Sequence, residues 1–291
     1  MISIIQLGTI DYATGLRLQQ QLVSLRKEEK IGDVLLLLEH SPVITLGRNA
    51  KTANVIASPE LLAQRGVELF ECDRGGDVTF HGPGQIVGYP IFDLRGHATP
   101  DGKRKTLGAI EFVRRLEEVL IRTCADFDIE TQRIASLTGV WTNPNPLSSR
   151  AKENDSKNRS LESRDLLLAG ATTGSNAAAE AKLAAIGVHI SRFVTSHGFA
   201  LNVNTDLSYF NLIIPCGLTA KPVTSMQKER GKEFDLNSVA ESISRNFGVV
   251  FQSQILCVDT LDALLGRTVG VPVRPPDELR KLHRQDDNAR A

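Results

Sequence analysis

The chain has 291 residues, and its 34 lysines and arginines are balanced by 34 aspartates and glutamates, so the formal net charge at pH 7 is zero. This balance argues against a protein that binds nucleic acid or an anionic membrane, because such proteins usually carry an excess of basic charge. Apolar residues make up 41% of the chain, which is typical of a folded protein with one large or two small domains.

The beginning of the chain carries no recognisable targeting segment. Met1 to Gln6 includes no basic residue, and the longest early apolar run, Val34–Leu38, is far shorter than the roughly 20 residues that cross a bilayer. The four cysteines are widely spaced, without a CxxC pair or a close histidine. We therefore expect a cytoplasmic protein with reduced thiols, and neither a disulfide framework nor a metal site is predicted.

The first third of the chain alternates helix and strand signals. Leucines at helical spacing among polar residues predict an amphipathic helix over Tyr12–Glu29. Asp33–Glu39 is predicted to be a buried strand. Ser58 followed by Pro59 is typical of a helix start, so a short helix is predicted that ends at Gly66.

The next part begins with a long helix and then loses its apolar pattern. Leu107–Asp126 has apolar residues at helical spacing from Ile110 onward. Residues 143–181 hold no valine, isoleucine or aromatic residue. Too little apolar surface is available there to offset the entropy of ordering, so a mobile polar insertion is expected. The remaining predicted elements are strands over 184–190, 194–204 and 212–214, a helix over Leu236–Phe247 and a frayed tail from 271.

The densest segment is Arg74–Pro90, which holds five glycines and two prolines in seventeen residues. Glycines allow the backbone to approach a ligand closely, and an arginine, a histidine and a glutamine lie among them. Neither GxGxxG nor GxxxxGK[ST] occurs in it, so it is not a known phosphate-binding loop. The segment is either a binding loop or a glycine-rich hairpin without a ligand.

Cys216 lies between a proline and a glycine, directly after a short apolar run. A nucleophilic thiol needs a nearby positive charge that favours the thiolate, and Lys182, His81, His189 and His197 are possible suppliers. The alternatives are a small buried side chain for the cysteine, a solvated strand-end lysine and structural histidines. The other three cysteines lack such neighbours and are expected to lie in or near the core.

Five segments, taken in order, resemble the motif set of the octanoyltransferases, also called lipoate-protein ligase B. They are Glu39–Arg48, Arg74–Gln85, Lys182–Gly187, Thr195–Asn202 and Pro215–Gly217. The resemblance covers roughly residues 1–142 and 182–250. The segment 143–181 departs from it, because family members usually pass from the Gly-Val-Trp strand to the lysine strand with only a few residues between.

The resemblance implies that an octanoyl group moves from acyl carrier protein to a lysine of a lipoyl domain, in 2-oxoacid dehydrogenase complexes or the glycine cleavage H protein, with no cofactor. Cys216 would form an acyl-thioester intermediate, and Lys182 would lower the pKa of Cys216 and transfer protons. The implied substrate-binding residues are Arg74, Gly75, Gly76, Asp77, Val78, Thr79, Phe80, His81, Ala185, Ile186, Gly187, Gly198, Phe199 and Ala200.

The implied fold is an α+β domain, a mixed β-sheet with packed helices, similar to the catalytic domains of biotin protein ligases and lipoate-protein ligases. We expect residues 1–250 to form a single catalytic domain, and 251–291 a C-terminal strand and a frayed charged tail. Because acyl carrier protein is acidic, a local basic patch is expected; its candidates are Arg48, Arg74, Lys221 and Lys228. The alternatives are an ATP-dependent lipoate or biotin ligase and a catalytically idle lipoyl-domain-binding protein.

Overall fold

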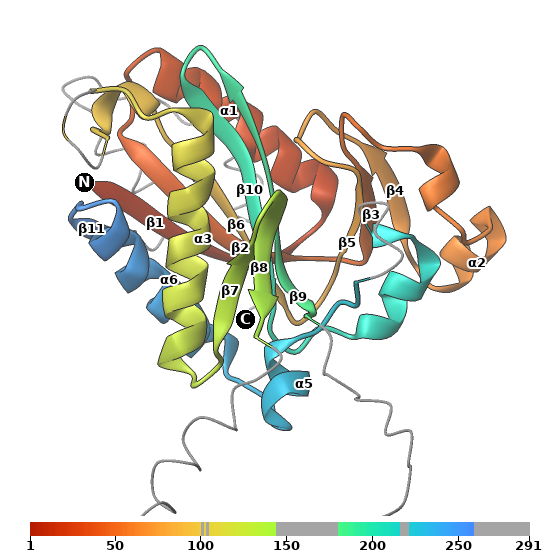
Figure 1. Cartoon of the computed structure of the whole chain (residues 1–291). Coiled ribbons are helices and arrows are strands. Elements are labelled where there is room, and N and C mark those ends of the chain that lie inside the picture. The colour runs from red at the N-terminus through yellow and green to blue at the C-terminus, as the bar shows by residue number, and fades with distance from the viewer. Residues whose placement is uncertain (100–101, 103–104, 144–179, 216–220, 259–291) are drawn as a thin grey trace, which may run out of the picture.

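The computed structural model of the chain describes residues 1–99, 102, 105–143, 180–215 and 221–258 (Figure 1). Most of the predicted insertion over 143–181 and the predicted tail from 271 lie outside these residues. So does Cys216, the predicted nucleophile, together with the four residues that follow it.

Eight strands form one mixed sheet. They are β1 (Ile2–Ile10), β2 (Asp33–His40), β6 (Gln85–Ile91), β7 (Thr131–Ile134), β8 (Leu137–Thr142), β9 (Lys182–Ser191), β10 (Val194–Asn202) and β11 (Ile255–Cys257). Their order across the sheet is β11-β1-β2-β6-β10-β9-β8-β7. β1 pairs in parallel with β11 and β2, whereas the other neighbours pair antiparallel.

Helices cover both faces of this sheet. α3 (Ala109–Asp126) and α6 (Leu236–Val250) pack on one face, and α1 (Tyr12–Lys27) packs on the other (Figure 1). Phe112 of α3 and Phe247 of α6 are fully buried against the first face, as Leu22 of α1 is against the second. Each such side chain stabilises the fold by about 1.5–3 kcal/mol. Within the described part of the chain, no helix is long and apolar enough to cross a membrane.

A second, three-stranded sheet lies beside the first. Its elements are β3 (Val43–Leu46), β4 (Glu68–Glu71) and β5 (Val78–His81), with α2 (Pro59–Gln64) and the 3₁₀ helices η1 (Thr52–Asn54) and η3 (Leu207–Leu212) around it. The strand order is β4-β3-β5. Ser58 caps α2 by accepting a hydrogen bond from the Leu61 N–H, as its sequence predicts. Two short helices complete the described fold: η2 (Leu94–Gly96) and α5 (Met226–Arg230).

The predicted α+β architecture is confirmed, but three details of the sequence interpretation are wrong. Ile110 is 77% exposed, because it lies two residues, or about 200°, around α3 from the buried Phe112. Residues 212–214 do not form a strand, since Leu212 ends η3 and Ile213 makes only an isolated bridge to Val55. Cys257 is exposed rather than near the core, because it lies on the outermost strand β11.

The pairing of β8 with β9 joins the two sides of the segment 144–179. Thr142 donates its N–H to the Ala181 carbonyl at 2.9 Å, and the Ala181 N–H donates to the Thr142 hydroxyl. The pairing of β8 with β9 therefore involves only residues that the structure describes. The same pairing brings β8 against the first residue of β9, Lys182.

Candidate active site

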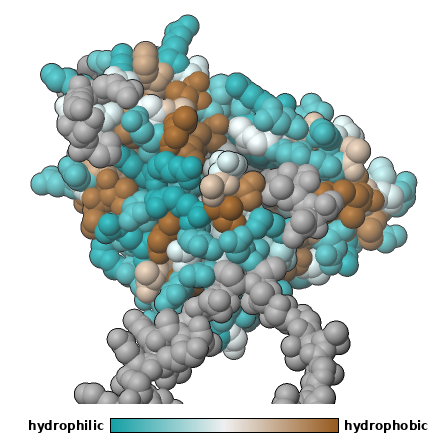
Figure 2. All heavy atoms as spheres, viewed as in Figure 1, coloured by the Kyte–Doolittle hydropathy of each residue, from teal (hydrophilic) through white to brown (hydrophobic). Residues whose placement is uncertain are grey.

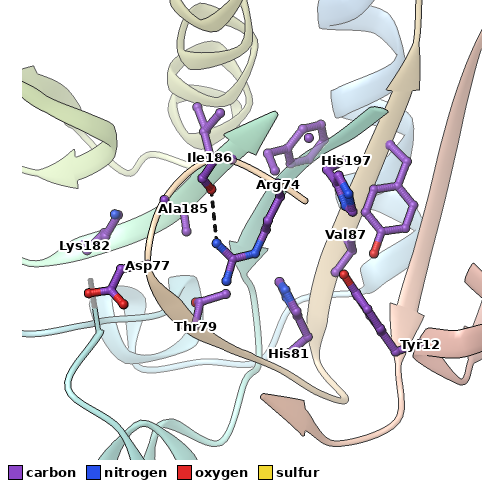
Figure 3. Close-up of a pocket in the computed structure, with 16 residues that line it drawn as sticks. Tyr12, Arg74, Asp77, Thr79, His81, Val87, Lys182, Ala185, Ile186 and His197 are labelled. Atoms are coloured by element: carbon purple, nitrogen blue, oxygen red, sulfur yellow. Dashed lines mark hydrogen bonds between the residues drawn. The ribbon is translucent and has the colours of Figure 1, made fainter. Parts of the chain in front are cut away.

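A single cavity collects residues from most of the predicted motifs (Figure 3). The space between its walls is about 500 Å³ when the solvent at its mouth is included. Lys182 lines it, and so do these predicted substrate-binding residues: Arg74, Gly75, Gly76, Asp77, Thr79, His81, Ala185, Ile186, Gly187, Gly198 and Phe199.

Three predicted binding residues do not line this cavity. Val78 and Phe80 are buried in the core beneath the small sheet, because side chains alternate along β5 and only Thr79 and His81 face the cavity. Ala200 is buried in the core under α1. The two segments that contain them, Arg74–Gln85 and Thr195–Asn202, therefore include residues that pack in the core as well as residues that line the cavity.

Lys182 is the first residue of β9 and lies against β8. Its Nζ is 5.2 Å from the centroid of the Trp141 ring, and Lys221 Nζ is 5.6 Å from the same centroid. Gly139 has φ +124°, and a Cβ there would lie 2.8 Å from Lys182 Cε and 2.5 Å from the Ala184 carbonyl oxygen. Glycine at 139 therefore lets β8 approach the Ala184 carbonyl of β9, and it leaves the space that the Lys182 side chain occupies.

Lys182 is also tied to the chain that follows the undescribed residues 216–220. Its backbone N–H donates to the Pro222 carbonyl at 2.8 Å, and its carbonyl accepts from the Thr224 N–H at 3.0 Å. These two hydrogen bonds hold residues 222–224 alongside the start of β9, where the cavity is lined by Lys182.

Cys216 itself lies outside the described residues, but the chain that leads to it is anchored. The Ile214 N–H donates to the Asn54 carbonyl at 2.7 Å. Asn54 in turn donates its side-chain N–H to Asp77 Oδ2 at 2.5 Å, and Asp77 Oδ1 accepts from the Lys51 N–H. Asp77 therefore connects the cavity wall to the segment that precedes Cys216.

Arg74 begins a short stretch of chain that passes over β9. Its buried guanidinium donates to the carbonyl of Thr45 at 2.6 Å and to the hydroxyl of Thr45 at 2.9 Å. The next residue, Gly75, donates its N–H to the Val188 carbonyl, and a Cβ on Gly187 would lie 2.5 Å from the Gly75 carbonyl oxygen. Residues 74–77 thus form a roof over the cavity, and glycine at 187 is what allows them to approach β9.

His81 is part of a buried hydrogen-bond chain. Burial, with the charge of nearby groups, lowers its pKa to about 3, so the ring is neutral and Nδ1 donates to Gln85 Oε1 at 2.7 Å. Gln85 donates to Asn202 Oδ1, and Asn202 donates to the Thr224 carbonyl. This chain ends on the backbone that holds Lys182.

His197 also lines the cavity, on the side away from Lys182 (Figure 3). Its φ is +55°, a strained value for a non-glycine residue. Its N–H donates to Gln19 Oε1, and Nε2 donates to Asp73 Oδ1, both at 2.7 Å. Burial lowers the pKa of His197, although Asp73 opposes the shift.

His189, another candidate from the sequence, does not line the cavity; its Nδ1 lies 2.8 Å from Arg48.

Sequence reasoning missed Tyr12, Val87 and Tyr89 as lining residues. Tyr89 donates its hydroxyl to His40 Nε2 at 2.6 Å, while His40 Nδ1 donates to the Ile10 carbonyl. Burial lowers the pKa of His40 to about 4, which keeps it neutral as these roles require. Val87 and Tyr89 lie within the glycine-rich segment, but no motif marks Tyr12, which begins a helix.

The candidates for a basic patch are spread over different surroundings. Arg74 is buried, Lys221 pairs with Glu180 at 2.5 Å, and Lys228 is exposed on α5.

A separate apolar surface covers α2 and the small sheet at one edge of the molecule (Figure 2), where the exposed side chains are Ile56, Leu61 and Leu69. Among the described residues, no cluster of His, Cys, Asp or Glu is suited to hold a metal ion.

Comparison with known proteins identifies the family. The model of the lipoyl protein ligase A/B catalytic domain matches residues 11–248. An octanoyltransferase of Koribacter versatilis is 54% identical over 286 residues, which are 98% of each chain. The chain belongs to the octanoyltransferase family. It is therefore an enzyme of the transferase class, and the resemblance of its motifs is confirmed.

A second relative supports the family, and two solved structures support the fold. An octanoyltransferase of Solibacter usitatus is 47% identical over 86% of this chain and 93% of its own. The bipartite lipoate protein ligase of Thermoplasma acidophilum, studied with its E2 lipoyl domain, superposes with a TM-score of 0.60 at 13% identity, over 98% of this chain and 91% of its own. An ATP-bound lipoate-protein ligase A superposes with a TM-score of 0.57 at 11% identity, over 98% of this chain and 94% of its own. At such identities these two structures establish the fold alone.

Proposed function

We propose that this enzyme transfers an octanoyl group from acyl carrier protein to the side-chain amine of a lysine in a lipoyl domain, through a thioester on Cys216. The observation that carries the proposal is the match to an octanoyltransferase over 98% of both chains. Lys182 in the cavity wall supports it, because this lysine is hydrogen-bonded to residues 222–224, a few residues after Cys216.

In the first half-reaction the Cys216 thiolate attacks the carbonyl carbon of the donor thioester. A new carbon–sulfur bond forms, the bond to the donor sulfur breaks, and the Lys182 ammonium gives its proton to the departing thiolate. In the second half-reaction the acceptor amine attacks the Cys216 thioester. An amide forms, the Cys216 thiolate leaves, and Lys182 takes the proton from the amine, which restores both groups to their starting state.

The cavity provides the acyl-binding site in this proposal. Ile186 and Phe199 give apolar contact, while the roof over β9 brings the backbone of Gly75 and Gly76 close to the bound chain. Glycines at these positions let the main chain approach the acyl group and its carbonyl. Arg74, fixed by its hydrogen bonds to Thr45, keeps the roof in place.

The partners follow from the same reaction. The donor is octanoyl-acyl carrier protein, and the acceptors are lipoyl domains of 2-oxoacid dehydrogenase complexes and the glycine cleavage H protein. A lipoyl domain is the partner of the ligase in the Thermoplasma structure. Exposed Lys228 on α5 and Lys221 beside Lys182 belong to the basic surface that we propose for the acidic donor.

A reconstituted transfer assay tests this function. Purified enzyme, octanoyl-acyl carrier protein and a lipoyl domain should give the octanoylated domain without ATP, as read by the mass of the domain. A parallel mixture with free octanoate and ATP tests the ligase that shares the fold. Octanoylation in the second mixture alone would make the enzyme a ligase, and binding without product in either mixture would make it an inactive lipoyl-domain-binding protein.

A further inference from the structure

β9 has a bulge directly after its first residue, Lys182. Successive residues of β8, 140 and 141, pair with Ala184 and Lys182, which leaves Leu183 as an extra residue in β9. An extra residue interrupts the alternation of side chains between the two faces of a strand. Leu183 and Ala184 are consecutive, yet both pack in the core under α3 and α6. Lys182 is thereby turned to the other face, where it lines the cavity together with Ala185 (Figure 3).

Gly139 is the residue of β8 that lies beside this bulge. Its φ of +124° is a conformation that glycine adopts far more readily than other residues. The same conformation leaves the space that the Lys182 side chain occupies. The Gly139 N–H donates to Oε1 of Glu117 in α3 at 3.2 Å. A side chain from a helix therefore holds the backbone next to Lys182.

Glu117 is a charged side chain in the interior of the protein. It is fully buried where α3 packs against β7 and β8 (Figure 1). Its Oε2 accepts from Arg114 at 2.6 Å and from Arg133 of β7 at 3.1 Å. A buried ion pair often adds no stability compared with apolar residues of similar volume. The pairing with arginine therefore does not by itself account for a carboxylate at this position.

The two oxygens of Glu117 differ in how much their partners need them. The side chains of Arg114 and Arg133 are 47% and 35% exposed, so both can turn to water. The Gly139 N–H is buried. A buried donor without an acceptor is costly, so the hydrogen bond to Gly139 is the contact that most requires an oxygen at this position.

We propose that Glu117 is a positioning residue for Lys182. By accepting the Gly139 N–H, it holds Gly139 in the conformation that leaves room for the lysine, and so keeps the ammonium group in the cavity wall. Without this hydrogen bond Gly139 takes other backbone conformations, and the lysine loses its fixed position. The inference rests on the proposed action of Lys182 on Cys216.

Glu117→Met tests the inference, because methionine is similar in size to glutamate and is only a weak acceptor. The pH dependence of Cys216 alkylation by iodoacetamide is followed by the mass of the peptide that contains Cys216. We expect the profile to shift to higher pH by about half a pH unit or more, in the direction expected for Lys182→Ala. Glu118→Met is the matched control and should retain the wild-type profile, because Glu118 also pairs with Arg133 but does not hold Gly139.

Two further variants separate a positioning role from a structural one. In Glu117→Gln the amide oxygen can accept from Gly139 while the arginines turn to water, so the wild-type profile should be kept at a lower free energy of unfolding. Removing one member of an ion pair can prevent folding. The shift is therefore also measured in Glu117→Met combined with Arg114→Met and Arg133→Leu, which removes the three charges together and should give the same shift.

A double variant tests whether Glu117 acts through Lys182. Added to Lys182→Ala, the Glu117→Met change should produce no further shift, whereas an additive shift would contradict the inference. A folded variant that lacks the acceptor and keeps the wild-type profile would overturn the role of Glu117. A Glu117→Gln profile shifted as far as that of Glu117→Met would do the same.

The failure of this inference is distinguishable from the failure of the proposed function. An unchanged profile in Lys182→Ala would overturn the action of Lys182 on Cys216, and the role of Glu117 with it. Alkylation needs no acyl donor. A wild type that never carries an octanoyl group would therefore remove the proposed function, while the alkylation profiles would still decide the role of Glu117.

Discussion

At the scale of single residues, neighbours on β8 hold Lys182 in the cavity wall. Gly139 and Trp141 of β8 form a socket for the lysine: the glycine leaves room for its methylene groups, and the ring lies beneath its ammonium. Such a contact between a cation and an aromatic face is worth about 0.5–2 kcal/mol. Lys221 contacts the same ring but does not line the cavity.

Replacing Lys182 tests its proposed action on Cys216. Lys182→Ala removes the positive charge that favours the Cys216 thiolate, so alkylation of Cys216 by iodoacetamide should shift to higher pH, by roughly one pH unit if the two groups are in contact. Lys221→Ala is the matched control and should retain the wild-type profile. Superimposable profiles for Lys182→Ala and the wild type would show that Lys182 does not activate the thiol.

The motifs of the sequence indicate some site residues and not others, for physical reasons. Arg74 and Lys182 stand in segments whose composition is unusual, so a pattern marks them. Tyr12 begins an ordinary amphipathic helix, and only the packing of α1 against β4 and β5 brings its ring to the cavity. His197 was recognised as a candidate, but its positive φ and its link to Gln19 depend on contacts between distant elements.

At the scale of elements, the roof over β9, residues 74–77, shapes the proposed acyl site. It depends on the close approach of Gly75 to β9, because a Cβ on Gly187 would lie 2.5 Å from the Gly75 carbonyl oxygen. Its glycines are visible in the sequence, but the strand that they approach lies more than 100 residues later. The sequence therefore predicts a loop whose backbone can approach a neighbour closely, but it does not identify β9 as that neighbour.

A methyl group placed at residue 187 tests the roof. In Gly187→Ala the new Cβ meets the Gly75 carbonyl oxygen at 2.5 Å, so the roof must shift. We expect a loss of about 1–3 kcal/mol in the free energy of unfolding and at least about a tenfold lower kcat/KM for transfer, since a small displacement at a site is costly. Gly32→Ala, where a Cβ meets open space, is the control. Equal activity of both variants would argue against the roof.

At the scale of the whole molecule, two sheets share a buried polar region that includes the neutral histidines His40 and His81. Both have a pKa well below 6.5 in the folded state, about 4 and about 3, chiefly because of burial. The unfolded chain therefore binds more protons than the folded chain below pH 6.5. Stability is highest above that pH and falls as the pH drops toward the folded-state values.

Chemical denaturation at several pH values tests this linkage. Between pH 6.5 and 5 each of the two histidines should lower the free energy of unfolding by about 2 kcal/mol. His40→Asn can keep a donor to the Ile10 carbonyl and removes one titrating group, so the variant should start from lower stability and show a shallower decline. A free energy of unfolding that does not change over this interval would contradict the neutral, buried state of both rings.

The overall architecture was accessible from sequence in part. Helical periodicity predicted α1, α3 and α6, and the strand patterns predicted β2, β9 and β10. β1 was not recognised, although it lies between β11 and β2, because Gly8 and a register shift interrupt its pattern. The order of the strands and the small sheet follow from pairings between distant segments, which local patterns do not encode; the implied fold came from the family resemblance.

The central claim, a covalent octanoyl intermediate on Cys216, is tested most directly by the intact mass of the full-length enzyme after mixing with octanoyl-acyl carrier protein in the absence of acceptor. The account predicts one octanoyl group on the wild type, which disappears when a lipoyl domain is added or when neutral hydroxylamine cleaves the thioester, and none on Cys216→Ala. A wild-type enzyme that transfers octanoyl groups to the domain yet never carries one, or an adduct that Cys216→Ala retains, would contradict it.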